Sequence, residues 1–123
     1  MDIGIDFGST YSTISIYRES SRNAEAIALA QGDPASIPSV VSLSKKGDVN
    51  YGKTAKNQIG YATYRIFEAF KMLLNETNQE ILKKRGYDDV HTPHWATKCF
   101  LNSIIRGAMK REEQKELGNV VIC

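Results

Sequence analysis

Two runs of alternating apolar and polar residues stand on either side of a short break near the start of the chain. The stretch is "IGIDFGSTYSTISIY", from Ile3 to Tyr17. Alternation with a period of two is typical of strands that bury one face. The break, Asp-Phe-Gly-Ser-Thr, is short enough to be a tight turn. The sequence therefore predicts paired strands at residues 2–7 and 11–17, joined by a bend.

This bend carries more polar chemistry than a turn requires. Gly8 permits close backbone approaches that a side chain would prevent. The hydroxyls of Ser9 and Thr10 add donors beside backbone amides, which can converge on an anion in such turns. Asp6, at the end of the first strand, can hold a hydrated cation near that anion. These residues predict a phosphate–Mg²⁺ site. The alternative is a hairpin loop whose aspartate and serine only hydrogen-bond the backbone.

Length, charge and cysteine content narrow the class of protein. A chain of 123 residues can bury one modest core, and its formal net charge of +2 lacks the basic excess of a nucleic-acid-binding protein. No stretch has the length and apolarity of a membrane span or a signal core. Cys99 and Cys123 lie far apart and predict reduced thiols. We expect a cytoplasmic protein without nucleic-acid or membrane partners.

Strands are expected first along the chain and helices later. Residues 24–30 predict a third strand or, less favoured, a short helix. The prolines of "QGDPASIP" exclude a central strand there. Further expected elements are strands at 39–44 and 49–52 and helices at 53–59 and 63–74. This order indicates an α/β unit.

A long helix is expected over residues 91–117. Thr92 is a candidate N-cap, Pro93 stands in the first turn, and Gly118 closes the helix. Trp95, Phe100 and Leu101 are expected in the core. A strand should begin at Val120, and because the chain stops inside that apolar run, we expect the front piece of a longer protein.

Four segments resemble one family in the same order. "GIDFGSTYS" is similar to the first phosphate loop of the actin-like ATPase superfamily. "IPSVVSL", "YGKTAKNQ" and the lysine of "FEAFK" resemble, at matching spacing, the 70-kilodalton heat-shock chaperones of the DnaK type. The resemblance is best over residues 1–75. It implies an α/β, ribonuclease-H-like fold with a mixed sheet and flanking helices. Only the N-terminal lobe would be present, with 1–36 and 93–123 as the inner subdomain and 37–92 as the outer one.

The resemblance also implies roles for particular residues. Asp6 would contact Mg²⁺ through its water shell, and the phosphates of ATP or ADP would be lined by Gly8, Ser9, Thr10 and Tyr11. Lys71 matches a lysine near the γ-phosphate and the attacking water, where its charge would stabilise phosphoryl transfer. Independently, Lys71 lies on the edge of the apolar stripe of the predicted helix 63–74. An ammonium there must snorkel, pair or point into a polar cleft.

The implied parent protein is a chaperone ATPase that opens and closes around unfolded polypeptide, with a J-domain co-chaperone and a nucleotide-exchange factor as partners and a role in the stress response. These 123 residues lack a second phosphate loop and should be inactive alone. Ser9 replaces a usual threonine, and Met72 stands where arginine is frequent. The alternatives are a bacterial actin-like filament protein that controls cell shape, or a sugar kinase of the superfamily.

A metal site is the remaining candidate. His91 and His94 flank Thr92-Pro93 at a spacing that some metal sites use. No further cysteine or acidic cluster supports them, so helix-start histidines that cap or face solvent are the favoured interpretation.

Overall fold

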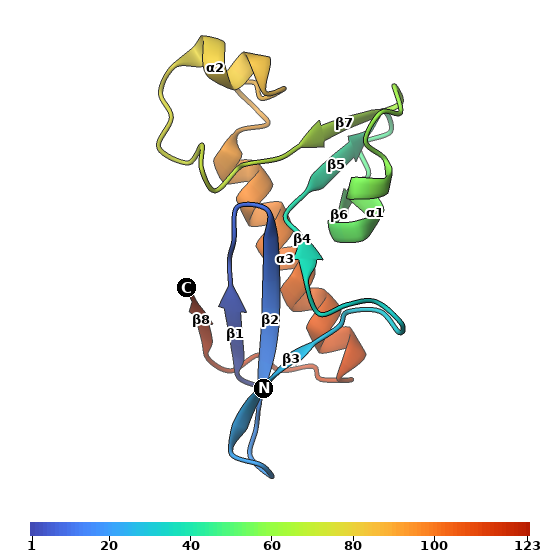
Figure 1. Ribbon diagram of the computed structural model, residues 1–123, viewed down its shortest axis with the longest axis vertical. Coiled ribbons are helices and arrows are strands. Elements are labelled where there is room, and N and C mark those ends of the chain that lie inside the picture. Colours follow the sequence, from blue (N-terminus) through green and yellow to red (C-terminus); the bar gives the residue numbers. More distant parts are fainter.

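The computed structural model describes residues 1–123, arranged as two β-sheets with one long helix that packs against both (Figure 1). The first sheet has the strand order β3-β2-β1-β8, and the short β4 pairs with β2. Its strands are β1 (Ile3–Asp6), β2 (Tyr11–Arg18), β3 (Asn23–Ile27), β4 (Ile37–Pro38) and β8 (Val120–Ile122). The second sheet has the order β6-β5-β7 and consists of β5 (Val41–Ser44), β6 (Val49–Tyr51) and β7 (Tyr64–Phe67).

The predicted pairing of the first two strands is confirmed. β1 and β2 are antiparallel, with Ile3 opposite Ile16 and Ile5 opposite Ile14. All four isoleucines are buried, so the alternating pattern sends one face of the hairpin into the core. The expected third strand is β3, which pairs antiparallel with β2. The strand expected at Val120 is β8, which runs parallel to β1.

The helix predicted over 63–74 is wrong. Residues Tyr64–Phe67 form β7, which pairs antiparallel with β5, and turns follow it to residue 75. Ala69 has a φ of 55°, in the left-handed region, which interrupts any right-handed helix there. The helix-like spacing arises because Phe67, Phe70 and Leu73 are all buried, the first from a strand and the other two from turns.

The long helix begins as predicted and ends earlier. The α3 helix spans Pro93–Arg111, and the Thr92 hydroxyl accepts a hydrogen bond from the Trp95 amide at 3.1 Å. It buries one stripe against the sheets, made of Pro93, Ala96, Phe100, Ile104 and Ala108. The predicted extension to Gly118 is wrong: Glu113 has a φ of 54°, and the charged residues after Met109 offer no apolar face to bury.

Two short helices complete the fold. The α1 helix (Gly52–Asn57) follows β6 and confirms the helix expected near 53–59. The α2 helix (Gln79–Lys84) was not predicted; the Asn78 side chain caps it by accepting from the amides of Glu80 and Ile81. No helix in the structure combines the length and apolarity needed to cross a membrane.

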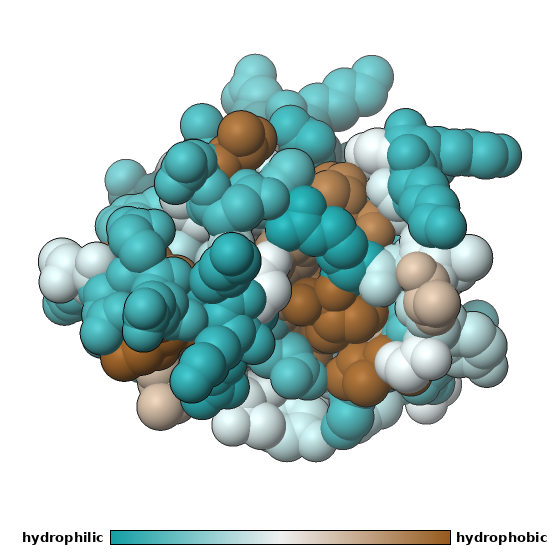
Figure 2. All heavy atoms as spheres, turned by 90° about the horizontal axis from the view of Figure 1, so that it is seen from above, coloured by the Kyte–Doolittle hydropathy of each residue, from teal (hydrophilic) through white to brown (hydrophobic).

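The end of the molecule that carries α2 has a mixed surface. Seen from above, apolar side chains gather in the middle of this face and hydrophilic ones surround them (Figure 2). Met72 is 67% exposed. Methionine in place of the arginine that is frequent at this position therefore changes the surface and not the core.

Candidate functional site

The bend between β1 and β2 is anchored by a buried phenylalanine. The Phe7 ring lies 6.0 Å from Phe70 and 6.2 Å from Phe100, measured between ring centroids. Its amide donates to the Cys123 carbonyl at 3.0 Å, which continues the pairing with β8. The loop that follows, residues 8–10, is therefore held on the core by the residue that precedes it.

Two buried serines bind both backbone groups of Gly8. Its amide donates to the Ser12 hydroxyl at 3.2 Å, and its carbonyl accepts from the Ser39 hydroxyl at 2.8 Å. The two hydroxyls are themselves 2.8 Å apart. Ser39 also donates its amide to the Thr10 carbonyl at 2.9 Å. No sequence pattern indicates this pair, because 27 residues separate the serines and only the pairing of β4 with β2 brings them together.

Other polar groups of the loop have no partner within the protein. The amides of Ser9 and Thr10 donate no hydrogen bond. Asp6 is exposed and forms no ion pair. The free amides and hydroxyls of this turn can donate hydrogen bonds to an anion. The nearby free carboxylate can accept hydrogen bonds from the waters around a cation.

Gly8 is required by the turn itself. A Cβ added there would overlap the carbonyl oxygen of Tyr11, a backbone atom that cannot rotate away. Its φ is not in the left-handed region, so the requirement is one of space and not of backbone angle.

Lys71 lies against this loop. Its Nζ atom donates to the Phe7 carbonyl at 2.6 Å and stands 5.6 Å from the centroid of the Phe7 ring. It is exposed, between the buried Phe70 and Leu73, in the turns after β7. The premise of a helical stripe was wrong for Lys71, yet the structure brings its ammonium group to the residue that precedes Gly8.

Tyr11 contacts a different part of the molecule. Its hydroxyl accepts a hydrogen bond from Lys56 of α1 at 2.9 Å, and the same ammonium lies 5.1 Å from the ring centroid. The tyrosine lines a cavity of about 540 Å³ between the β3–β4 connection and α1, which also carries the ion pair of Lys53 with Asp33. Its side chain is thus directed to α1, while its backbone closes the loop.

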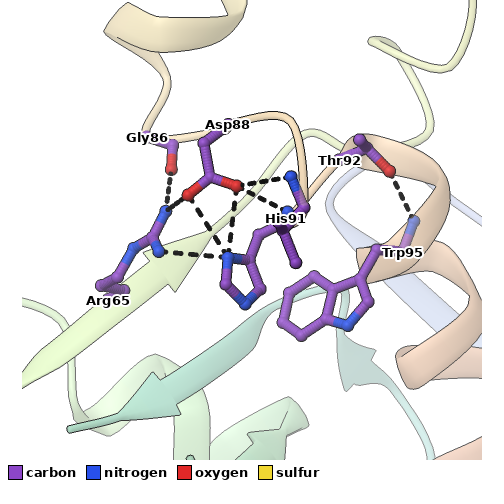
Figure 3. Close-up of polar contacts among 7 residues, drawn as sticks. Arg65, Gly86, Asp88, His91, Thr92 and Trp95 are labelled. Atoms are coloured by element: carbon purple, nitrogen blue, oxygen red, sulfur yellow. Dashed lines mark hydrogen bonds and ion pairs between the residues drawn. The ribbon is translucent and has the colours of Figure 1, made fainter.

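The two histidines are not part of a metal cluster. The structure holds no group of three or more metal-ligating side chains. His91 belongs to the network in Figure 3, where its Nδ1 atom lies 3.3 Å from Asp88 and 3.2 Å from Arg65. Its ring packs edge-on against Trp95 at 4.7 Å. His94 is exposed.

Asp88 organises this network as a turn residue. Its carboxylate accepts from the amides of His91 at 2.6 Å and Val90 at 2.9 Å, and from Arg65 at 3.0 Å. The His91 amide is the main reason that the pKa of the Asp88 carboxyl lies well below its usual range. The network ties β7 to the start of α3 and carries no signature of catalysis.

We expect Asp88→Asn to reduce the loss of stability in acid. A carboxyl with a lowered folded pKa stabilises the protein above its unfolded pKa of about 3.9, and this contribution is lost progressively as the pH falls from that value toward the folded pKa. Because the side chain is 46% exposed, the contribution at neutral pH should not exceed about 1 kcal/mol. Urea denaturation at about pH 5 and about pH 3 measures how much the free energy of unfolding falls between the two. An equal fall in the wild type and in Asp88→Asn would contradict the prediction.

Both cysteines are free thiols. Cys99 is partly buried, and this burial raises the pKa of its thiol, so it is a weak nucleophile. Burial also raises the pKa of Tyr87, whose hydroxyl donates to the Glu68 carbonyl at 2.6 Å.

A comparison with protein families identifies the kind of domain to which this chain is similar. A family model described as Hsp70 protein matches residues 2–92. The matched segment contains the whole bend, the serine pair and Lys71, and it ends immediately before α3. It favours the chaperone family over the filament proteins and sugar kinases that share the opening loop.

Proposed function

The chain belongs to the Hsp70 protein family, and from that premise we propose that residues 8–10 bind the phosphates of ATP, with Lys71 beside them. At the family level, this is part of a chaperone ATPase domain that binds nucleotide, and family members act on client polypeptides.

One observation carries the proposal. In a loop whose Gly8 is fully bonded, the amides of Ser9 and Thr10 stay free, and an ammonium group stands within 2.6 Å of the adjoining Phe7 carbonyl. Free amides at a turn attract an anion, and the lysine adds a full positive charge. A hairpin loop that only reverses the chain does not require free amides and an ammonium group at the same bend.

Asp6 fits a magnesium ion bound through water. Mg²⁺ keeps several waters in proteins and takes one or two carboxylates together with phosphate oxygens. Asp6 is one free carboxylate, with no second acid required beside it. When bound, the ion would neutralise phosphate charge during transfer. The residues of the chain would hold the nucleotide, with Asp6 orienting the hydration shell and Lys71 placed toward the γ-phosphate.

The two sheets support a division into subdomains. We assign residues 1–36 and 93–123 to an inner subdomain and 37–92 to an outer one, in the N-terminal lobe of a ribonuclease-H-like fold. The second sheet lies wholly within 37–92. The first sheet draws on both termini and takes only the two-residue strand β4 from that range. The site would then stand where the two subdomains meet, since Lys71 of the outer one reaches Phe7 of the inner one.

The wider function follows from the family. ATP turnover in the full-length protein would gate the binding of unfolded polypeptide, assisted by a J-domain co-chaperone and a nucleotide-exchange factor, in the cytoplasm and in the stress response. The site of this chain supplies one side of the nucleotide pocket in that cycle.

We expect the 123-residue chain to bind Mg-ATP weakly and not to hydrolyse it, because it holds only one phosphate loop. Titration into the millimolar range, followed by ¹H–¹⁵N NMR, should move the amide signals of residues 6–11 and leave those of residues 85–91 unchanged. Asp6→Asn should weaken this response in the presence of Mg²⁺ without changing the melting temperature, because Asp6 has no protein partner.

The matched control is Asp48→Asn, since Asp48 is also exposed and stands in the turn between β5 and β6. It should respond to Mg-ATP as the wild type does. Shifts spread over the whole surface, or equal responses of Asp6→Asn and wild type, would contradict the assignment. Calorimetric binding in the low micromolar range would contradict the expectation of a weak, incomplete site.

A further inference from the structure

The hydrogen bonds of the serine pair have a single possible direction. The Ser39 hydroxyl has one proton, and it is donated to the Gly8 carbonyl. The bond between the two hydroxyls must therefore be donated by Ser12. Ser12 in turn accepts from the Gly8 amide. The result is a one-way ring that leaves Gly8 through its N–H, passes through both serines and returns to its C=O.

This ring fixes the peptide planes on both sides of Gly8. Its N–H belongs to the Phe7–Gly8 peptide, whose carbonyl accepts from Lys71, so both ends of that plane are bonded. Its C=O belongs to the Gly8–Ser9 peptide. In a trans peptide the C=O and N–H point in opposite directions, and no peptide bond here is cis. Because the Gly8 carbonyl points to Ser39, the Ser9 N–H points away from the serine pair.

We infer that Ser12 and Ser39 are positioning residues, which aim the Ser9 amide at a bound phosphate without touching it. This inference rests on the proposed function of the loop. The serines are 1% and 2% exposed, so water does not compete for the hydrogen bonds of the ring. A fixed amide binds an anion better than a mobile one, because its orientation has no entropic cost at the moment of binding.

The inference separates two roles that a buried serine can have. The loss of a serine that only stabilises the fold lowers apparent ligand affinity only through the fraction of chain that is unfolded. The loss of a positioning serine lowers the affinity of the folded chain itself. The chain offers a matched control in Ser42, which is also fully buried and donates its hydroxyl to Gln58, away from the loop.

The test compares Ser12→Ala, Ser39→Ala and Ser42→Ala in the full 123-residue chain. Affinity for Mg-pyrophosphate is measured from amide shifts, and the mobility of the Gly8, Ser9 and Thr10 amides from ¹⁵N relaxation. We expect each ring variant to weaken pyrophosphate binding by about tenfold and to raise the mobility of these amides. Ser42→Ala should change neither the pyrophosphate affinity nor the amide mobility, even if its midpoint of denaturation falls as far as those of Ser12→Ala and Ser39→Ala. Ser39→Thr, which keeps a hydroxyl, should bind more tightly than Ser39→Ala.

Ser12→Ala and Ser39→Ala break the ring at different residues, so the test needs only one of them to fold. Wild-type affinity and wild-type mobility in the ring variants would overturn the positioning role. A fall in affinity that follows stability equally in all three variants would also overturn it. A wild-type chain that shows no response to Mg-pyrophosphate would instead reject the proposed function of the loop, while the mobility data would still show whether the serines order it.

Discussion

Gly8→Ala should destabilise the chain by about 1–3 kcal/mol, the usual cost of forcing extra volume into a packed site. The added methyl group would overlap the Tyr11 carbonyl oxygen. That oxygen is part of the backbone at the start of β2, so relief requires the turn itself to open. Opening the turn would separate Gly8 from the serine pair, and binding of Mg-ATP or Mg-pyrophosphate should then fall below detection.

Gly4→Ala is the matched control for this variant. Gly4 lies in β1, four residues before Gly8, and a Cβ there would have no heavy atom within 4 Å. It should be neutral or stabilise by less than about 1 kcal/mol, because alanine restricts the unfolded chain. Urea denaturation of both variants compares them directly. A Gly8→Ala protein as stable as Gly4→Ala would mean that the turn adapts easily, and that the glycine serves only the approach of a ligand.

The structure adds a reason for Gly8 to the one that the sequence suggested. The residues of the bend predicted a glycine that lets phosphate approach the backbone. The structure shows that the glycine already has a role without a ligand, because the chain turns back on itself at Tyr11. The sequence indicates that the turn needs a glycine, and only the folded structure shows which atom excludes a side chain.

Local patterns predicted the elements whose packing agrees with their spacing. The isoleucines of β1 and β2 alternate and are buried in the same alternation, so the hairpin was predictable. At Phe67, Phe70 and Leu73 the buried residues have helical spacing, but a strand and turns supply them. That failure has a physical cause: pairing of β7 with β5 is a long-range contact, and it outweighs local periodicity.

The residues of the candidate site can be recognised from the sequence where they are continuous or where a family pattern carries them. Asp6, Gly8, Ser9 and Thr10 stand together in one bend, and the resemblance indicated Lys71. Ser12 and Ser39 could not be predicted, because serine has no distinctive pattern in a strand and their contact forms only in the folded chain. The resemblance places Tyr11 among the phosphate-lining residues, and the contact of its side chain with Lys56 has no signal in the sequence.

The position of Lys71 allows two explanations that make different predictions. Its hydrogen bond to the Phe7 carbonyl could simply hold the loop, in which case its loss would lower stability and nucleotide affinity together. An ammonium group that stabilises the charge developing in phosphoryl transfer would instead affect the rate of turnover far more than affinity. The lysine is exposed, so its hydrogen bond alone should contribute only about 1 kcal/mol.

In the full-length protein we therefore expect Lys71→Ala to lower the single-turnover rate of ATP hydrolysis by about 10²-fold or more, the size expected for loss of one electrostatic contact to a transition state. Affinity for Mg-ATP should fall by less than about tenfold, and the melting temperature should change little. Lys71→Met, which keeps an apolar stem over the Phe7 ring, should be as slow as Lys71→Ala, since both lack the charge. Lys53→Ala removes an exposed lysine whose partner is Asp33 and should hydrolyse ATP at the wild-type rate. If Lys71→Ala lost affinity and stability while its bound ATP was hydrolysed normally, Lys71 would be a support for the loop, and another group of the protein would have to supply the charge.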